Sequence, residues 1–180
     1  MRRTYQNRGG LRMRRWYLIM LLAVFLSPGL FPGRPAAAGE TSGLPLPRFV
    51  SLRSDEVNLR TGPGQRYPID WTYTRKDLPV EVIAEFEAWR KIRDWQGTEG
   101  WVHQSMLSGR RMMVVIGSAR SLRNSDSDSS DPVAIVEPGV LGRLLQCPRN
   151  RDFCRVEVKS VQGWLRRDEI WGVYKGEWIE

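Results

Sequence analysis

The hydrophobic positions after residue 48 fall in short runs between turns, with no sustained helical repeat. These runs are rich in β-branched and aromatic residues, which favour strands. We predict strands at 57–60, 79–87, 88–95, 100–103, 111–116, 120–122, 133–136, 141–147, 153–159, 163–165 and 172–174. Strands this short and this evenly spaced indicate an all-β fold made of small barrels.

The second half of the pattern echoes the first. Gly100-Trp101-Val102 precedes the run HQSML, and Gly163-Trp164-Leu165 precedes RRDEI at the same relative place. The spacing of about 60 residues is too long for a solenoid repeat, and only two copies are present. The pattern therefore indicates a duplicated domain.

The N-terminal segment has the composition of an export signal. Residues 1–15 contain six arginines and no acid, and an unbroken apolar run, 16–26, follows. Eleven residues are too few for a membrane-spanning helix, which needs about 20. An A-x-A site ends at Ala38, so we predict a signal peptide, 1–38, cleaved before Gly39. The alternative is an uncleaved anchor.

Removal of residues 1–38 changes the electrostatics of the chain. They carry seven of the 28 Lys and Arg and none of the 20 Asp and Glu, which leaves 21 cations against 20 acids, a net charge of +1. A nearly neutral exported chain disfavours nucleic-acid binding. We predict an exposed linker at 39–48, a first domain at 49–116 and a second domain at 117–180, located in the periplasm or cell envelope.

One set of residues carries a family resemblance. The run Asn58-Leu59-Arg60-x-Gly62-Pro63-Gly64-x-x-Tyr67-Pro68, a hairpin containing Trp89 and then Gly100-Trp101-Val102 resemble the bacterial SH3-like domain (SH3b) of exported proteins. The resemblance covers residues 49–111, and residues 117–175 resemble a divergent second copy. It implies two tandem SH3-like β-barrels that bind peptides or cell-wall material, or that serve as structural adaptors.

The glycine-rich loop of this motif does not fit a phosphate site. A P-loop requires a lysine and a Ser or Thr after its glycines, at the start of a helix. Here Tyr67 and Pro68 follow, and a proline at this point opposes a helix. We therefore expect Gly62 and Gly64 to supply unusual backbone angles around Pro63 in a tight loop.

The resemblance implies a ligand groove between this loop and the hairpin at Trp89. The candidate groove residues are Arg60, Tyr67, Trp71, Trp89 and Trp95. Tyrosine and tryptophan offer a large amphipathic contact area at low entropic cost. In the alternative interpretation Trp71 and Trp89 fill the core and Arg60 binds loop carbonyls. Trp101 and its counterpart Trp164 are predicted to be core residues.

The two cysteines, Cys147 and Cys154, lie at the ends of a candidate hairpin. In an oxidising compartment an even cysteine count indicates a disulfide. A catalytic cysteine acting with His103 would require a reduced thiol, and the two residues fall in different copies. We predict the disulfide.

We interpret two charged stretches as solvent-exposed. Residues 123–131 lack the glycine and the final glutamate of an EF-hand loop, so we predict no metal site there. The basic stretch 143–155 is typical of a solvated face, with docking on anionic wall polymer as the alternative.

These observations predict a protein that is not an enzyme and that uses no cofactor and no metal. We expect a binding module of the periplasm or cell envelope that docks an extended peptide or a peptidoglycan stem on the first domain. The alternative is a structural adaptor that holds an envelope protein without a small ligand.

Overall fold

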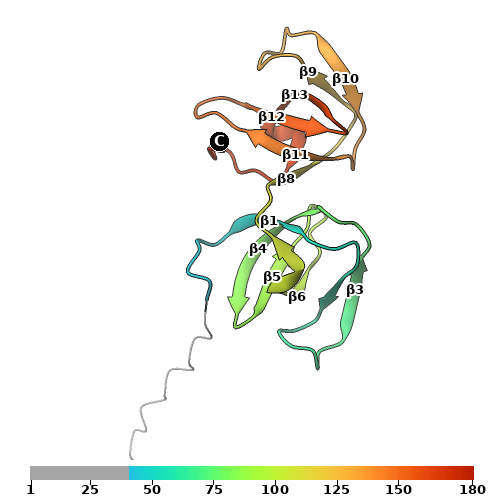
Figure 1. Ribbon diagram of the computed structural model, residues 1–180, viewed down its shortest axis with the longest axis vertical. Helices are drawn as coiled ribbons and strands as arrows, with labels where there is room; N and C mark the ends of the chain where they lie inside the picture. The colour runs from blue at the N-terminus through green and yellow to red at the C-terminus, as the bar shows by residue number, and fades with distance from the viewer. Residues whose placement is uncertain (1–40) are drawn as a thin grey trace, which may run out of the picture. The chain divides into compact units, whose positions relative to one another are not determined.

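A computed structural model describes residues 41–180 (Figure 1). The predicted signal peptide, its cleavage site between Ala38 and Gly39, and residues 39–40 of the predicted linker lie outside the described residues.

The first sheet is antiparallel and has seven strands in the order β3-β2-β6-β5-β4-β1-β7. Its strands are β1 (Arg48–Leu52), β2 (Val57–Arg60), β3 (Ile69–Tyr73), β4 (Pro79–Phe86), β5 (Trp89–Arg93), β6 (Glu99–His103) and β7 (Leu107–Ser108). A single 3₁₀ turn, η1 (Gln104–Met106), joins β6 to β7.

The second sheet repeats this topology strand for strand, in the order β10-β9-β13-β12-β11-β8-β14. Its strands are β8 (Met112–Val115), β9 (Arg120–Arg123), β10 (Pro132–Val136), β11 (Leu141–Gln146), β12 (Phe153–Val158), β13 (Val161–Arg166) and β14 (Ile170–Trp171). The turn η2 (Arg167–Glu169) takes the place of η1. The all-β prediction is confirmed, although each sheet is open because its first and last strands do not pair.

The strand predictions differ from the structure at several points. The sequence pattern missed β1, β3, β7 and β14, and residues 172–174 form no strand. β8 belongs to the second sheet, where it pairs with β11 and β14, although we assigned its residues to the first domain. The first sheet therefore ends at Ser108, and the second begins at Met112. The predicted linker, 39–48, overlaps the first residue of β1.

The first core lies where β-branched and leucine side chains of several strands converge. Leu52, Leu59, Val80, Val82 and Ile92 are fully or almost fully buried there. Gly100 belongs to this packing, because a Cβ on it would stand 2.5 Å from Leu59 Cγ. The glycine of the Gly-Trp-Val motif thus lets a leucine of β2 rest directly on β6.

The second core repeats the same contact. Leu122, Val156 and Leu165 are completely buried, and both cysteines join them. A Cβ on Gly163 would stand 2.6 Å from Leu122 Cγ, which matches the packing of Gly100 on Leu59. The two copies therefore share a packing rule as well as a strand order.

The prediction that Trp101 and Trp164 are core residues needs correction. Both side chains are only half-buried, while Val102 and Leu165 beside them are fully buried. Since side chains alternate between the two faces of a strand, the buried neighbour assigns the tryptophan to the other face. The tryptophans thus cover the outside of β6 and β13.

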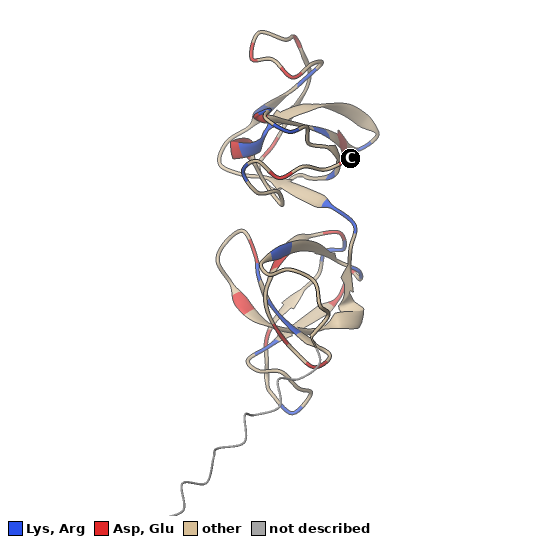
Figure 2. Ribbon diagram, turned by 90° about the vertical axis from the view of Figure 1, so that its left-hand side faces the viewer, with Lys and Arg blue, Asp and Glu red and all other residues tan. Residues whose placement is uncertain are grey.

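The described surface carries charges of both signs. Basic and acidic residues are interspersed along both sheets in Figure 2, in keeping with the near-zero charge calculated for residues 39–180. None of the helices formed by residues 41–180 is long and apolar enough to cross a membrane.

The segment that enters β1 is held by Glu85 on β4. The backbone N–H and the hydroxyl of Ser42 both donate to the Glu85 carboxylate at 2.7 Å, and Arg48 donates to it as well. Burial alone would raise the pKa of Glu85, but these hydrogen bonds outweigh it and lower the pKa to about 2. Ser42, which we placed in a flexible linker, is therefore fixed to the first sheet.

We expect the first sheet to lose stability, on the order of 2 kcal/mol, as the pH falls from about 4.5 to about 2. The pKa of Glu85 is depressed in the folded state, so its contribution is complete above the unfolded pKa and disappears as the folded carboxylate takes up its proton. Urea unfolding at several pH values, followed by tryptophan fluorescence, measures this loss. Glu85→Gln should flatten the pH dependence in this window, and an unchanged dependence in that variant would contradict the assignment.

Candidate functional site

The loop between β2 and β3 is closed by hydrogen bonds and by one aromatic ring. The Arg60 guanidinium donates to the carbonyl oxygens of Gln65 and Tyr67, at 3.1 and 2.7 Å. A Cβ on Gly62 would stand 2.4 Å from Tyr67 Cδ1, so the tyrosine ring lies directly on the Gly62 backbone. Arg60 thus shapes the loop, as the alternative interpretation of this residue expected.

The reason we gave for the two glycines is wrong. Neither Gly62 nor Gly64 has a positive φ. Gly62 is required because the Tyr67 ring approaches its backbone too closely for a side chain, and Gly64 closes a turn by accepting from the Tyr67 N–H at 3.2 Å. Pro63 lies between them, half-buried.

Trp71 and Trp95 line one cleft of the first sheet. Trp71 stands on the edge strand β3 and is 57% exposed, while Trp95 is half-buried against the first core. Together with Tyr73, Leu78 and neighbouring polar residues they enclose a cleft of about 240 Å³, which we call the Trp71 cleft. An exposed indole beside a partly sheltered one offers apolar area without the need for a deep pocket.

A buried hydrogen-bond network fixes the wall of the Trp71 cleft. Asp94 accepts from the Tyr73 hydroxyl at 3.0 Å and from the backbone N–H groups of Gln96 and Thr98 at 2.9 Å each. Burial of the Tyr73 ring, together with the nearby Asp94 carboxylate, raises the pKa of the phenol well above its usual value. The loop that carries Trp95 is therefore held in place by a satisfied carboxylate.

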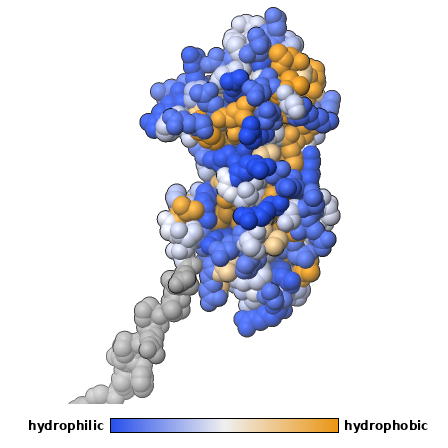
Figure 3. Space-filling model, in the orientation of Figure 1, coloured by the Kyte–Doolittle hydropathy of each residue, from blue (hydrophilic) through white to orange (hydrophobic). Residues whose placement is uncertain are grey.

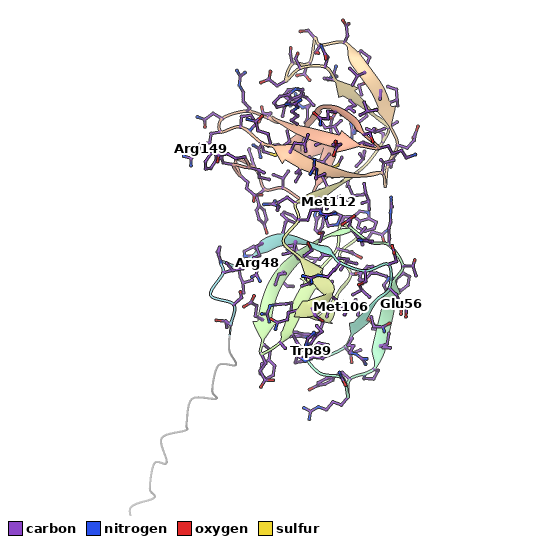
Figure 4. All side chains as sticks on the ribbon, viewed as in Figure 1. Arg48, Glu56, Trp89, Met106, Met112 and Arg149 are labelled. Atoms are coloured by element: carbon purple, nitrogen blue, oxygen red, sulfur yellow. A yellow bond between two sulfur atoms is a disulfide. The ribbon has the colours of Figure 1, made fainter. Side chains whose placement is uncertain are left out.

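Arg60 and Trp89 line a second, smaller cavity of about 180 Å³. Its other lining residues are Glu56, Asn58, Gln65, His103 and Met106. Glu56, Trp89 and Met106, labelled in Figure 4, come from the loop between β1 and β2, from β5 and from η1. The Trp89 ring meets the His103 ring edge to face at 5.5 Å.

Four of the five predicted groove residues therefore line two separate cavities. Trp71 and Trp95 share one, Arg60 and Trp89 share the other, and Tyr67 lines neither of the two. Sequence reasoning missed His103 as a lining residue, although its alternation with Val102 on β6 places it on the same face as Trp101. It also missed Tyr73 and Asp94, whose pairing across 21 residues has no local signal.

The predicted disulfide is confirmed. Cys147 and Cys154 are bonded, both are completely buried, and no free cysteine remains in the described part of the chain. Cys147 also exchanges two backbone hydrogen bonds with Ile179, at 2.8 and 3.1 Å. The bonded sulfurs exclude the catalytic cysteine that was weighed together with His103.

Comparison with known proteins adds a family and a relative. Residues 53–109 match the bacterial SH3 domain family model. The chain is 22% identical over 179 residues to the "Putative N-acetylmuramoyl-L-alanine amidase YrvJ" of Bacillus subtilis (strain 168). This alignment covers 88% of the chain but only 31% of the relative, so the chain spans about a third of the length of that protein.

Two solved structures show a weaker likeness. NlpC1 and NlpC2 from Trichomonas vaginalis are each 13% identical with a TM-score of 0.32. The matches cover 79% and 72% of this chain and 51% and 48% of theirs.

The prediction that the protein is not an enzyme needs correction. The relative with which the chain aligns over 88% of its length is named as an amidase, which is a hydrolase.

The family resemblance predicted from the sequence is confirmed over the first sheet. Residues 53–109 of the chain match the bacterial SH3 domain family.

Proposed function

We propose that the protein works in the bacterial cell envelope in the turnover of the cell wall, and that its first sheet binds an extended peptide such as a peptidoglycan stem. Support for the setting comes from the SH3 family match and from the amidase relative. Support for the ligand comes from the Trp71 cleft.

The observation that carries the proposal is the exposure of β3. This strand lies at the edge of the first sheet, and its first four residues are all exposed, with Trp71 at 57% and Ile69 at 49%. An edge strand has unpaired N–H and C=O groups, onto which an extended peptide can add as a further strand. The Trp71 cleft then provides a pocket for one side chain of that peptide.

A second candidate function, an adaptor that holds an envelope protein, is favoured by a different strand. β10 is the edge of the second sheet, and it exposes Val133 at 45% and Ile135 at 61%. Hydrophobic residues gather over this region in Figure 3. The exposure of Trp71 favours peptide binding over this alternative, because a pure adaptor has no need of an open aromatic cleft on the first sheet.

We expect Trp71→Ala to weaken the binding of solubilised peptidoglycan fragments by about tenfold or more, as removal of a central aromatic anchor does at interfaces. A tryptophan-fluorescence titration of the purified protein measures the affinity. The matched control is Trp178→Ala, which removes a tryptophan of similar exposure, 48%, from outside the cleft.

Circular dichroism and thermal unfolding show whether each variant remains folded. Absence of saturable binding at millimolar fragment, or equal weakening by Trp71→Ala and Trp178→Ala, would contradict the proposal. Weakening by Trp89→Ala alone would move the peptide to the cavity lined by Arg60 and Trp89.

A further inference from the structure

Each sheet contains one buried arginine that ties its central hairpin to the 3₁₀ turn. In the first sheet this is Arg90, which is 5% exposed. Its guanidinium donates to the carbonyls of Glu87 and Trp89 and to the side chain of Gln104 in η1. The Glu85 carboxylate lies 3.1 Å from Arg90 Nε and is itself 1% exposed, so the buried charge is neutralised.

In the second sheet the buried arginine lies in the 3₁₀ turn and contacts the hairpin loop. Arg167 lies in η2 itself, is 9% exposed, and donates to the carbonyls of Pro148 and Arg151 in the hairpin loop and to that of Tyr174. Within residues 41–180 no carboxylate lies within 4.0 Å of this guanidinium. Three of its five N–H groups are used, all by neutral oxygens.

Burial disfavours the charged form of the Arg167 guanidinium. Burial lowers the pKa of Arg167, and the nearby carboxylates of Glu177 and Asp152 oppose this only in part. Glu177 is already engaged, since it accepts from Arg111 and from the Tyr174 N–H. A buried cation without an ionic partner is unfavourable, so an anion bound beside it would be attracted more strongly than at the surface.

A cavity of about 340 Å³ lies beside Arg167, and we call it the Arg167 cavity. Its other lining residues are Asp152, Arg166, Asp168, Val173 and Lys175. Arg166 is paired with Asp128 at 2.7 Å and with Asp168 at 3.3 Å. Lys175 is exposed and forms no ion pair with residues 41–180, so the unpaired charges of the lining are Arg167 and Lys175 against Asp152.

We propose that the Arg167 cavity binds the free C-terminal carboxylate of a short peptide. In this proposal the carboxylate is bound by the guanidinium of Arg167 and the ammonium of Lys175, the two cations that line the cavity without an ion pair to residues 41–180. The volume falls within the range of small-molecule sites, which exceeds the size of a lone oxyanion, and half-buried Val173 offers an apolar wall for the terminal side chain. This site is independent of the first sheet and of the function proposed for it.

The test is a titration of the whole protein with N-acetyl-alanyl-alanine, followed by the ¹⁵N–¹H amide signals of Val173 and Lys175. We expect saturable shifts, and binding at least about tenfold weaker for the same peptide with a C-terminal amide. Lys175→Gln should weaken the acid peptide by about threefold or more. The matched control, Lys159→Gln, removes another exposed lysine, which lies outside the cavity, and should leave the affinity unchanged.

Asp152→Asn should change the affinity for the acid peptide in the opposite direction. It removes the like charge beside the carboxylate and keeps an acceptor oxygen, so it should tighten the binding of the acid peptide. Equal affinity for acid and amide peptides, or insensitivity to both Lys175→Gln and Asp152→Asn, would overturn the proposal. If inorganic phosphate binds as tightly as the peptide, the assignment of a peptide as the ligand is overturned. Trp71→Ala should leave this titration unchanged, so failure here is separate from failure of the peptide site on β3.

Discussion

Gly172→Ala is expected to destabilise the second sheet by about 3–5 kcal/mol, the range of the most damaging single substitutions. Gly172 follows β14 with φ at +127°, where a side chain is strained. A Cβ there would also stand 2.3 Å from the carbonyl oxygen of Met112 and 3.1 Å from Met113 Cα. Both contacts are with backbone of β8, which cannot rotate away as a side chain can.

Gly139→Ala separates the two causes of this loss. Gly139 also has a positive φ, +78°, but a Cβ on it would meet nothing within 4 Å. It should therefore cost only the backbone strain, about 1–2 kcal/mol. Urea unfolding of both variants by circular dichroism gives the comparison. If the two substitutions cost the same, the close approach of Gly172 to β8 is not a determinant of stability.

Removal of the disulfide is expected to lower the free energy of unfolding of the second sheet by about 2–3 kcal/mol, from the entropy of closing a short loop. The bond joins residues seven apart, Cys147 directly after β11 and Cys154 within β12. Cys147→Ala/Cys154→Ala is the suitable variant, because both sulfurs are buried and serine would place two hydroxyls in the core. The first sheet has no cysteine and should keep its stability.

Hydrogen exchange resolves the two sheets in one experiment. Protection of the Leu165 amide on β13 should fall in the double variant, while protection of the Leu59 amide on β2 should not change. A reducing agent should reproduce the effect in the natural protein and have none on the variant. An equal loss of protection in both sheets would show that the bond acts on the whole chain.

The sequence predicted most strands that carry at least two buried or apolar positions, and it missed short or exposed ones. β2 buries Val57 and Leu59 and β6 buries Gly100 and Val102, each at every second position, and both strands were recognised. β3 was missed because its first four residues are all exposed, so no alternation marks it. β7 and β14 have two residues each, too few to form a pattern. β1 was missed because two prolines and an arginine precede Phe49 and give the start of that stretch the composition of a linker.

The candidate site was predicted in its residue types and not in its arrangement. Exposed Trp71 beside Trp95 follows from the aromatic pattern, but the separation of Arg60 and Trp89 into another cavity depends on how β3 and β5 lie on either side of β2 and β6. Arg167 could not be found at all. It stands in the run RRDE, which has the composition of a solvated turn, and its burial depends on carbonyls up to 19 residues away.

The hydrogen bonds of the buried Arg167 also determine where the chain can accept additional sequence. In the second sheet the loop 148–152 supplies two of the three carbonyl oxygens that accept from the Arg167 guanidinium. A tag or a fluorescent label inserted there would displace these carbonyls and break the contact between the loop and η2. The loop 124–131 joins β9 to the edge strand β10, and it is mostly exposed. A reporter inserted there would break the exposed ion pairs of Asp126 with Arg151 and of Asp128 with Arg166, but it would leave the disulfide and the carbonyls that receive the Arg167 guanidinium in place.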